Sequence, residues 1–262
     1  MSASGTGDLT DLTTLAVLAL AGVVAGATSA IAGGGTFFTF PVLIWAGLPP
    51  LVANTTNMVA LLPANGTALP PLRHQLRKLG RRVLVPVVAG VVGGTTGAML
   101  LLYLGDAVFA SAVPYLIGFA TLLFATAPTL RRIFAAASSA GSDPSPPATA
   151  ILVLIFSIYG GYFGAGIGQI LLAAMILIGF EDLRQANALK NLVGFAISLV
   201  AVIIFIGSGT VHWTFALVMM VSSALGGYLG GTFSVVAPPQ LLRRGIIAFG
   251  CFLTLYYFTF GA

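Results

Sequence analysis

The sequence predicts an all-α integral membrane protein. In this fold two halves of five segments each form an inverted repeat, with Gly-broken short or re-entrant helices near the midplane. Only 6% of the 262 residues are charged and 58% are hydrophobic, whereas a soluble domain carries about 25% charged residues. The few charges divide the chain into about ten apolar segments, most of them long enough to cross a bilayer. The two halves also resemble each other in sequence.

The first half, residues 1–137, is expected to contain five of these segments. No charge occurs between Asp11 and Arg73. That stretch has room for about three segments, because a helix rises about 1.5 Å per residue and the hydrocarbon core is about 30 Å thick. A fourth segment fits between Arg82 and Asp106, and the fifth follows Asp106.

The second half, residues 151–262, follows a Ser/Pro-rich linker, SSAGSDPSPPATA, at 138–150. Two apolar segments precede Glu181, two lie between Lys190 and Arg243, and one follows Arg243. Because five crossings are an odd number, the two halves are expected to have opposite orientations. Many secondary transporters are built on this plan.

The repeat consists of four short matches that occur in the same order in both halves. ANTTNMVA at 53–60 matches ANALKNLVG at 186–194, a shift of 133 residues. The small-residue spacing in 90–97 and in 226–231 also predicts close helix packing. The other matches are GGGTFF (33–38) with GAGIGQI (164–170), GGTTGA (93–98) with GGYLGG (226–231), and GFATLLF (118–124) with GCFLTLY (250–256).

The basic residues predict the orientation of the chain. The densest cluster, RHQLRKLGRR at 73–82, is assigned to the cytoplasm by the positive-inside rule. Counting segments from this cluster places 127–150 in the cytoplasm and both termini outside, in the periplasm, for a multi-pass protein of the cell inner membrane. The net charge of +5 reflects this bias, so no nucleic acid partner is expected.

The glycine-rich stretch of each half is expected to form a substrate site. The apolar pieces that follow, Thr36–Gly47 and Gln169–Gly179, are too short to span the bilayer, so the glycines should lie near the midplane. A helix that begins there offers unpaired N–H groups and a partial positive charge to an anion. The alternative is that these glycines only allow close helix packing. The residues assigned to substrate binding are Gly33, Gly34, Gly35, Thr36, Gly166, Gly168 and Gln169.

Polar residues inside the apolar segments form the second part of the predicted site. Such residues are costly in a membrane unless they are paired, and their side-chain amides can donate to substrate oxygens. Lys190 lies about two turns into its segment and suits an anionic substrate. The alternatives are hydrogen bonds between helices for the asparagines, and extension to the cytoplasmic surface for the lysine. The residues assigned here are Asn54, Asn57, Asn187, Lys190 and Asn191.

No catalytic site, metal site or cofactor is expected. The six acidic residues lie at segment ends or in loops, so hydrolysis lacks a buried acid pair, and neither histidine has a carboxylate or cysteine nearby in the sequence. GAGIG at 164–168 lacks the βαβ unit of a dinucleotide-binding motif. Because no segment has a central acid, transport is expected to be coupled through the membrane potential or the charge or protonation of the substrate.

The glycine-rich stretch before Pro41, GLPP at 47–50 and ANTTN at 53–57 together resemble the TauE/SafE family of sulfite and organosulfonate exporters. GGYFGAGIGQILLAAMILIGFEDLRQANALKN at 160–191 is similar to the second repeat of that family. The resemblance covers about residues 12–260 and implies an inner-membrane permease for small sulfur-containing anions such as sulfite, sulfoacetate or another sulfonate. The chain departs from the family pattern at Ile167, where the family often continues with glycine, and at Lys190, near a position often held by Thr or Ser. Both departures are consistent with a different substrate.

The sequence therefore predicts a secondary transporter, an exporter of sulfonates or sulfite that works by alternating access between the repeats. A passive anion channel is one alternative. The other is a membrane subunit that docks a soluble partner through 73–82 and transports nothing itself. The exact substrate, the direction of transport, the coupling ion, the oligomeric state and the choice between re-entrant loops and full hairpins stay open.

Overall fold

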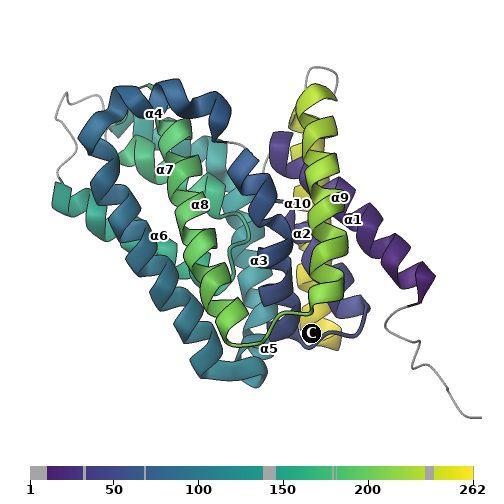
Figure 1. The fold of residues 1–262 in the computed structure, drawn as a ribbon. Coiled ribbons are helices and arrows are strands. Elements are labelled where there is room, and N and C mark those ends of the chain that lie inside the picture. The colour runs from purple at the N-terminus through teal and green to yellow at the C-terminus, as the bar shows by residue number, and fades with distance from the viewer. Residues whose placement is uncertain are drawn as a thin grey trace, which may run out of the picture.

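The computed structural model describes residues 11–31, 34–67, 69–137, 146–178, 180, 182–233 and 239–261. These residues form a bundle of α-helices joined by short turns (Figure 1). The helices are α1 (Leu12–Ile31), α2 (Thr36–Trp45), α3 (Pro50–Thr67), α4 (Arg73–Leu79), α5 (Leu84–Ala137), α6 (Pro146–Tyr162), α7 (Ile167–Leu177), α8 (Leu183–Gly207), α9 (Trp213–Phe233) and α10 (Pro239–Phe260), with 3-10 turns η1 (Pro70–Leu72) and η2 (Gly80–Val83) on either side of α4.

Helix α5 is bent sharply at Gly105, whose φ of 75° is in a region that favours glycine. The bend gives α5 a first arm, residues 84–104, and a second arm, residues 106–137. Each half of the described chain then has five apolar helical segments, as predicted. These are α1, α2, α3 and the two arms of α5 in the first half, and α6 to α10 in the second.

Three helical stretches among the described residues are long and apolar enough to cross a membrane: Leu12–Ser29, Pro50–Thr129 and Arg184–Gly207. Shorter apolar helices accompany them, and α2 and α7 have only 10 and 11 residues. The prediction that the pieces after the glycines are too short to span is therefore confirmed. Residues 138–145 of the predicted linker lie outside the described residues, and 146–150 form the start of α6.

Small residues set the closest helix contacts. Helix α1 packs along α9, and a Cβ on Gly26 or Gly226 would lie 2.0 Å from a carbonyl oxygen of the facing helix. The first arm of α5 packs in the same way on α6, where a Cβ on Gly97 would lie 2.1 Å from the carbonyl oxygen of Ile158. The predicted packing role is confirmed for Gly97 and Gly226, and Gly26 shares it. Helix α3 runs between α8 and α9 and contacts both (Figure 1).

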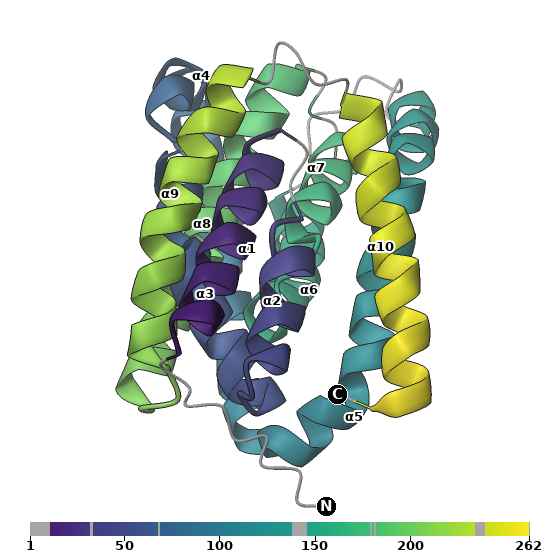
Figure 2. The same cartoon turned by 90° about the vertical axis from the view of Figure 1, so that its right-hand side faces the viewer.

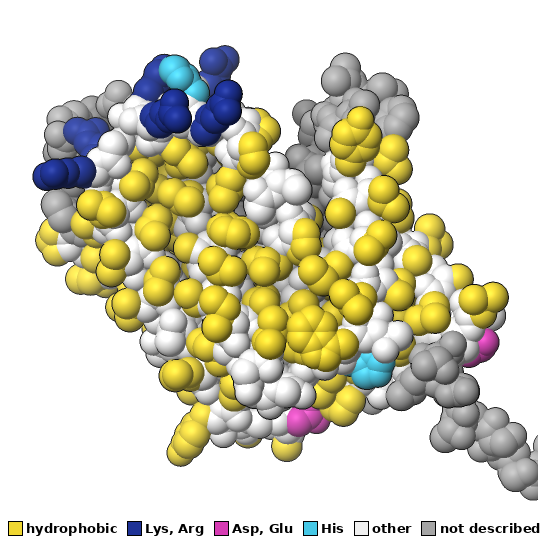
Figure 3. Space-filling model, viewed as in Figure 1, with side chains coloured by type: hydrophobic (Ala, Val, Ile, Leu, Met, Phe, Trp, Pro, Cys, Tyr) yellow, Lys and Arg dark blue, Asp and Glu magenta, His cyan; other side chains and the backbone are white. Residues whose placement is uncertain are grey.

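The outer surface suits a bilayer. Large apolar side chains cover the face in Figure 3, Lys and Arg gather at the α4 end, and Asp and Glu occur only toward the other end of that face. Among the most exposed apolar residues is Tyr103, at 87%. Helix α1 begins and α10 ends at the end of the bundle opposite α4 (Figure 2). The basic cluster and the described chain ends are therefore at opposite ends of the bundle.

Candidate functional site

The first glycine break lies between α1 and α2. Gly34 has a φ of +89°, which L side chains rarely adopt, and a Cβ on Gly35 would lie 2.4 Å from Ser29 Oγ. Gly34 therefore provides the turn, and Gly35 lets α2 begin close against α1. Gly33, the third glycine assigned to the site, lies outside the described residues.

The second break lies between α6 and α7 and uses the same device. Gly164 and Gly166 have φ values of +79° and +73°, and α7 begins directly after Gly166. Aromatic packing brings the two breaks together. The ring of Phe40 in α2 lies edge-on to the ring of Phe163, at a centroid distance of 5.5 Å, and both rings are buried.

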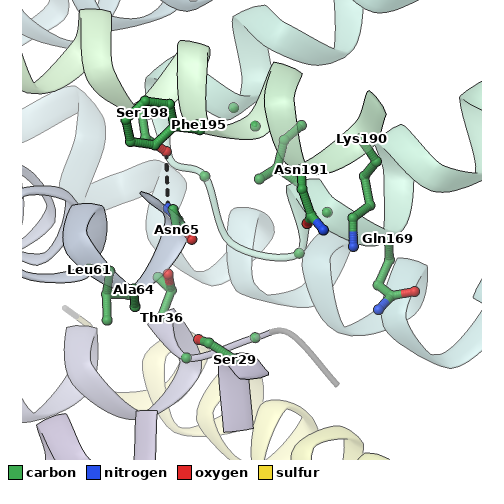
Figure 4. Close-up of a pocket in the computed structure, with 18 of the residues that line it drawn as sticks. Ser29, Thr36, Leu61, Ala64, Asn65, Gln169, Lys190, Asn191, Phe195 and Ser198 are labelled. Carbon is green, nitrogen blue, oxygen red and sulfur yellow. Dashed lines mark hydrogen bonds between the residues drawn. The ribbon is translucent and has the colours of Figure 1, made fainter. Parts of the chain in front are cut away.

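A cavity of about 770 Å³ lies where the two breaks meet. Figure 4 shows Lys190, Asn191 and Gln169 directed toward a common open space, with Thr36 and Ser29 contributed from the other break. Of the twelve residues assigned from sequence, those that line the cavity are Gly34, Gly35, Thr36, Asn57, Gly166, Gly168, Gln169, Asn187, Lys190 and Asn191.

Hydrogen bonds among neighbouring side chains hold the first turn of α2 against α3. Asn57 of α3 donates from Nδ2 to Thr36 Oγ1 at 3.4 Å, and its Oδ1 accepts a hydrogen bond from Thr39. The same Thr39 hydroxyl lies 3.1 Å from the Gly35 carbonyl oxygen, which shares its single proton, and Asn57 is only 1% exposed. Asn57 therefore fixes the start of α2 against α3. Thr36 does not cap α2, because the cap position is Gly35 and no side chain caps there.

The first turn of α7 is more open. A Cβ added to Gly168 would meet nothing within 4 Å, so this glycine borders free space. The Ile167 and Gln169 amides donate to the Gly164 and Gly166 carbonyls, but the Gly168 N–H has no acceptor among the described residues. Lys190 and Asn191 of α8 line the cavity beside this turn. The α7 end thus combines a donor N–H with a nearby cation, which is an arrangement suited to an oxyanion.

Asn54, the other asparagine of ANTTN, lies away from the cavity. It is fully buried, and its Nδ2 donates to the Tyr162 carbonyl at the end of α6, at 3.0 Å. The next two residues of α3 also form hydrogen bonds to distant parts of the chain. Thr55 donates to the Thr210 carbonyl at 2.7 Å, and Thr56 accepts from the His212 amide at 3.0 Å. These bonds tie α3 to the end of α6 and to the turn between α8 and α9.

The cavity extends to only one end of the bundle. Its lining reaches Thr67 and Pro71, just before α4, whereas the described residues of the α8–α9 turn and the Gly105 bend contribute nothing to it. At that second end Asp106 accepts a hydrogen bond from the Leu51 amide at 2.8 Å, at the start of α3. We call the contacts of residues 51–56 the α3 seal, because they close the bundle at the end opposite α4.

Sequence reasoning missed five polar residues of the cavity: Ser29, Asn65, Thr67, Ser198 and Arg243. Asn65 of α3 donates to Ser198 Oγ of α8 at 3.3 Å (Figure 4). From the sequence, the positive-inside rule explains Arg243 only as a cytoplasmic charge at the end of a segment. A usable signal was Pro128, since a proline inside a helix frees the carbonyl four residues before it, and Arg243 bonds to that carbonyl.

The charges on the cavity lining are all positive. Lys190 and Arg243 are its charged members, and the described lining includes no Asp or Glu. Among the described residues no group of three or more His, Cys, Asp or Glu side chains is placed to hold a metal ion. The site therefore offers cations, amides and backbone N–H groups, which are the groups that bind an anion.

Comparison with known proteins agrees with this arrangement. The family model described as sulfite exporter TauE/SafE matches residues 18–257. The chain belongs to the TauE/SafE family. No solved structure matches it.

Among similar proteins, a probable membrane transporter protein of Haemophilus influenzae is 30% identical over 250 residues, covering 92% of each chain. The probable membrane transporter protein YfcA of Escherichia coli is 28% identical, over 89% of this chain and 85% of its own. A third, from Sinorhizobium, is 25% identical over 87% and 86%. The predicted family is confirmed, and the chain is a helical membrane protein of a transporter family.

Proposed function

We propose that this TauE/SafE protein is a secondary transporter that exports small sulfur-containing oxyanions, such as sulfonates or sulfite, across the cell inner membrane. The observation that carries the proposal is the cavity at the junction of two glycine breaks, lined by two cations and no described carboxylate. A cavity bounded by broken helices is where inverted-repeat transporters bind their substrates. The family description, sulfite exporter, supports the choice of a sulfur oxyanion.

The helix contacts support an inverted repeat. In the repeat alignment α1 corresponds to α6, and the first arm of α5 corresponds to α9. In the structure α1 packs on α9, and α6 packs on the first arm of α5. Each helix of one pair therefore corresponds in the repeat to a helix of the other pair, as expected if a two-fold axis relates the two halves. The Asn65–Ser198 hydrogen bond joins residues 133 apart, the same shift as the sequence match. Such a contact is expected where a two-fold axis passes between α3 and α8.

Alternating access is supported by the one-sided cavity. We place the α4 end in the cytoplasm by the positive-inside rule, with the termini in the periplasm. The cavity then extends toward the cytoplasm, and the α3 seal closes the periplasmic side. Opening the seal and closing the cytoplasmic side would carry an anion outward. A continuous channel is not favoured by this arrangement, because the seal interrupts the path.

We propose that the substrate binds mainly at the α7 end. Gly168 offers its N–H, Lys190 its charge, and Gln169, Asn187 and Asn191 complete the polar lining. Asn57 holds the start of α2, and Gly34, Gly35 and Gly166 shape the breaks. Asn54 is left out of the binding set because it belongs to the α3 seal.

The test is counterflow in proteoliposomes that contain the purified protein. Vesicles loaded with unlabelled sulfite, sulfoacetate or taurine receive a trace of the same labelled anion outside. A carrier accumulates the label transiently and saturates with concentration, whereas a channel gives linear flux without accumulation. Absence of any flux, with the protein folded, would instead favour the docking subunit. Acetate-loaded vesicles give the background for a non-sulfur anion.

A further inference from the structure

Arg243, near the start of α10, is held at the cavity by backbone carbonyls. Its Nε and one terminal nitrogen each donate to the Phe124 carbonyl at 3.2 Å, and the same terminal nitrogen donates to the Ala125 carbonyl at 2.7 Å. The Phe124 carbonyl is available because its helical donor would be the N–H of residue 128, which is Pro128. Proline therefore creates the acceptor that positions this arginine.

These bonds orient Arg243 but provide no opposite charge from the part of the chain that the structure describes. Carbonyls are neutral, and among the described residues Arg243 forms no ion pair with a carboxylate. Its second terminal nitrogen forms no hydrogen bond to another described residue. A guanidinium has two N–H groups on that nitrogen, and the residue lines the cavity. An anion entering the cavity is the natural partner for these groups.

Lys190 and Arg243 reach the cavity from different helices, α8 and α10. The charge of one small monoanion bound at the α7 end can be balanced by the nearby Lys190 alone. The cavity, at about 770 Å³, has room for a molecule of several heavy atoms. Two cations on separate helices of one cavity suit a ligand that carries two negative groups.

We infer that Arg243 is a specificity-determining residue of the proposed transport site, and that it selects organic anions with two acidic groups. One group binds at the α7 end with Lys190, and the other binds the free face of the Arg243 guanidinium. This inference rests on the proposed function. Pro128 is a positioning residue, because it frees the carbonyl that aims the guanidinium.

The experiment measures the binding of ethane-1,2-disulfonate and ethanesulfonate to the purified protein by calorimetry. The two probes differ in the number of acidic groups and share the same carbon chain. We expect the wild type to bind the disulfonate at least tenfold more tightly. Arg243→Gln should abolish this preference while changing ethanesulfonate affinity less than threefold. The matched control Arg244→Gln, at the next, exposed position, should keep the preference.

Pro128→Ala provides a second variant, in which the restored N–H competes with Arg243 for the Phe124 carbonyl. We expect it to reduce the preference without removing the cation. Arg243 is not specificity-determining if Arg243→Gln keeps the wild-type preference, or if it weakens both probes equally. An unchanged preference in Pro128→Ala would refute the positioning role. If the wild type binds neither these probes nor sulfite, the proposed function itself fails, which is a distinct result.

Discussion

Replacing Gly168 by alanine should separate ligand binding from folding. An added Cβ meets nothing within 4 Å, so the folded protein accommodates it without a clash. Alanine is favoured over glycine in a helix by about 0.8–1 kcal/mol in the interior, and by less in the first turn. We therefore expect the unliganded variant to be as stable as the wild type or more stable by up to about 1 kcal/mol.

The same methyl group should weaken the binding of an anion. It occupies the space beside the Gly168 N–H, which is the donor without an acceptor among the described residues. A hydrogen bond to a charged group contributes about 1.5–3 kcal/mol, and 1.4 kcal/mol is a factor of about ten in affinity. Loss of this contact predicts roughly 10-fold to 100-fold weaker binding of a sulfonate.

Thermal unfolding with and without ligand provides the assay, and Gly245→Ala is the matched control. Gly245 lies in α10, outside the cavity lining, and a Cβ there also meets nothing within 4 Å. The control should gain stability without a change in affinity. If Gly168→Ala binds sulfonates with wild-type affinity, the anion does not approach the first turn of α7, and the proposed binding mode is wrong.

Three further predictions test the fold, the seal and a helix cap. Gly26→Val should lower the free energy of unfolding by more than about 2 kcal/mol, because even its Cβ would lie 2.0 Å from a carbonyl oxygen of α9; chemical denaturation measures this. Thr55→Val removes a seal hydrogen bond. The measurement is the rate at which a thiol reagent, added from the periplasmic side, labels a protein that carries Asn65→Cys in the cavity and Cys251→Ser to remove the native thiol. Thr55→Val should increase this rate, and an unchanged rate would count against the seal. Asp182 accepts the Arg184 amide at the start of α8, which lowers the pKa of its carboxyl below the usual 3.8. Its stabilisation is therefore present above that value and lost as the pH falls through the lowered pKa. Asp182→Asn, which keeps a capping side chain, should remove this part of the acid dependence of the melting temperature.

Much of the architecture follows from the sequence because its causes are local. Charges mark where segments end, and a glycine at positive φ, such as Gly34 or Gly166, marks where a helix cannot continue. The short lengths of α2 and α7 follow from these breaks and from the turns that end them. The matched halves then bring the two breaks together, and most of the assigned residues line the resulting cavity.

The remaining features depend on contacts that are distant in sequence. Asn54 and Asn57 are three residues apart and chemically identical, yet Asn54 faces the end of α6 and Asn57 faces α2. Only the packing of α3 decides which of them reaches the cavity. Arg243 lies more than 110 residues from the carbonyls that hold it. A positive charge near the end of a segment is also what the positive-inside rule predicts for a cytoplasmic residue without a role in binding. Pro128 indicates a free carbonyl at Phe124, but only the fold shows that Arg243 is the residue that reaches it.

The central claim is that the cavity binds a sulfur oxyanion beside Lys190. The most direct measurement is thermal stabilisation of the purified protein by sulfite, sulfate, thiosulfate, sulfoacetate, taurine and acetate. Wild type is compared with Lys190→Ala and with Lys78→Ala, a control on exposed α4. A ligand at a hundred times its dissociation constant adds about 2.7 kcal/mol. The account predicts that sulfite or a sulfonate stabilises the wild type and the control, and stabilises Lys190→Ala less. No stabilisation by any sulfur oxyanion, or equal stabilisation of all three proteins, would contradict it.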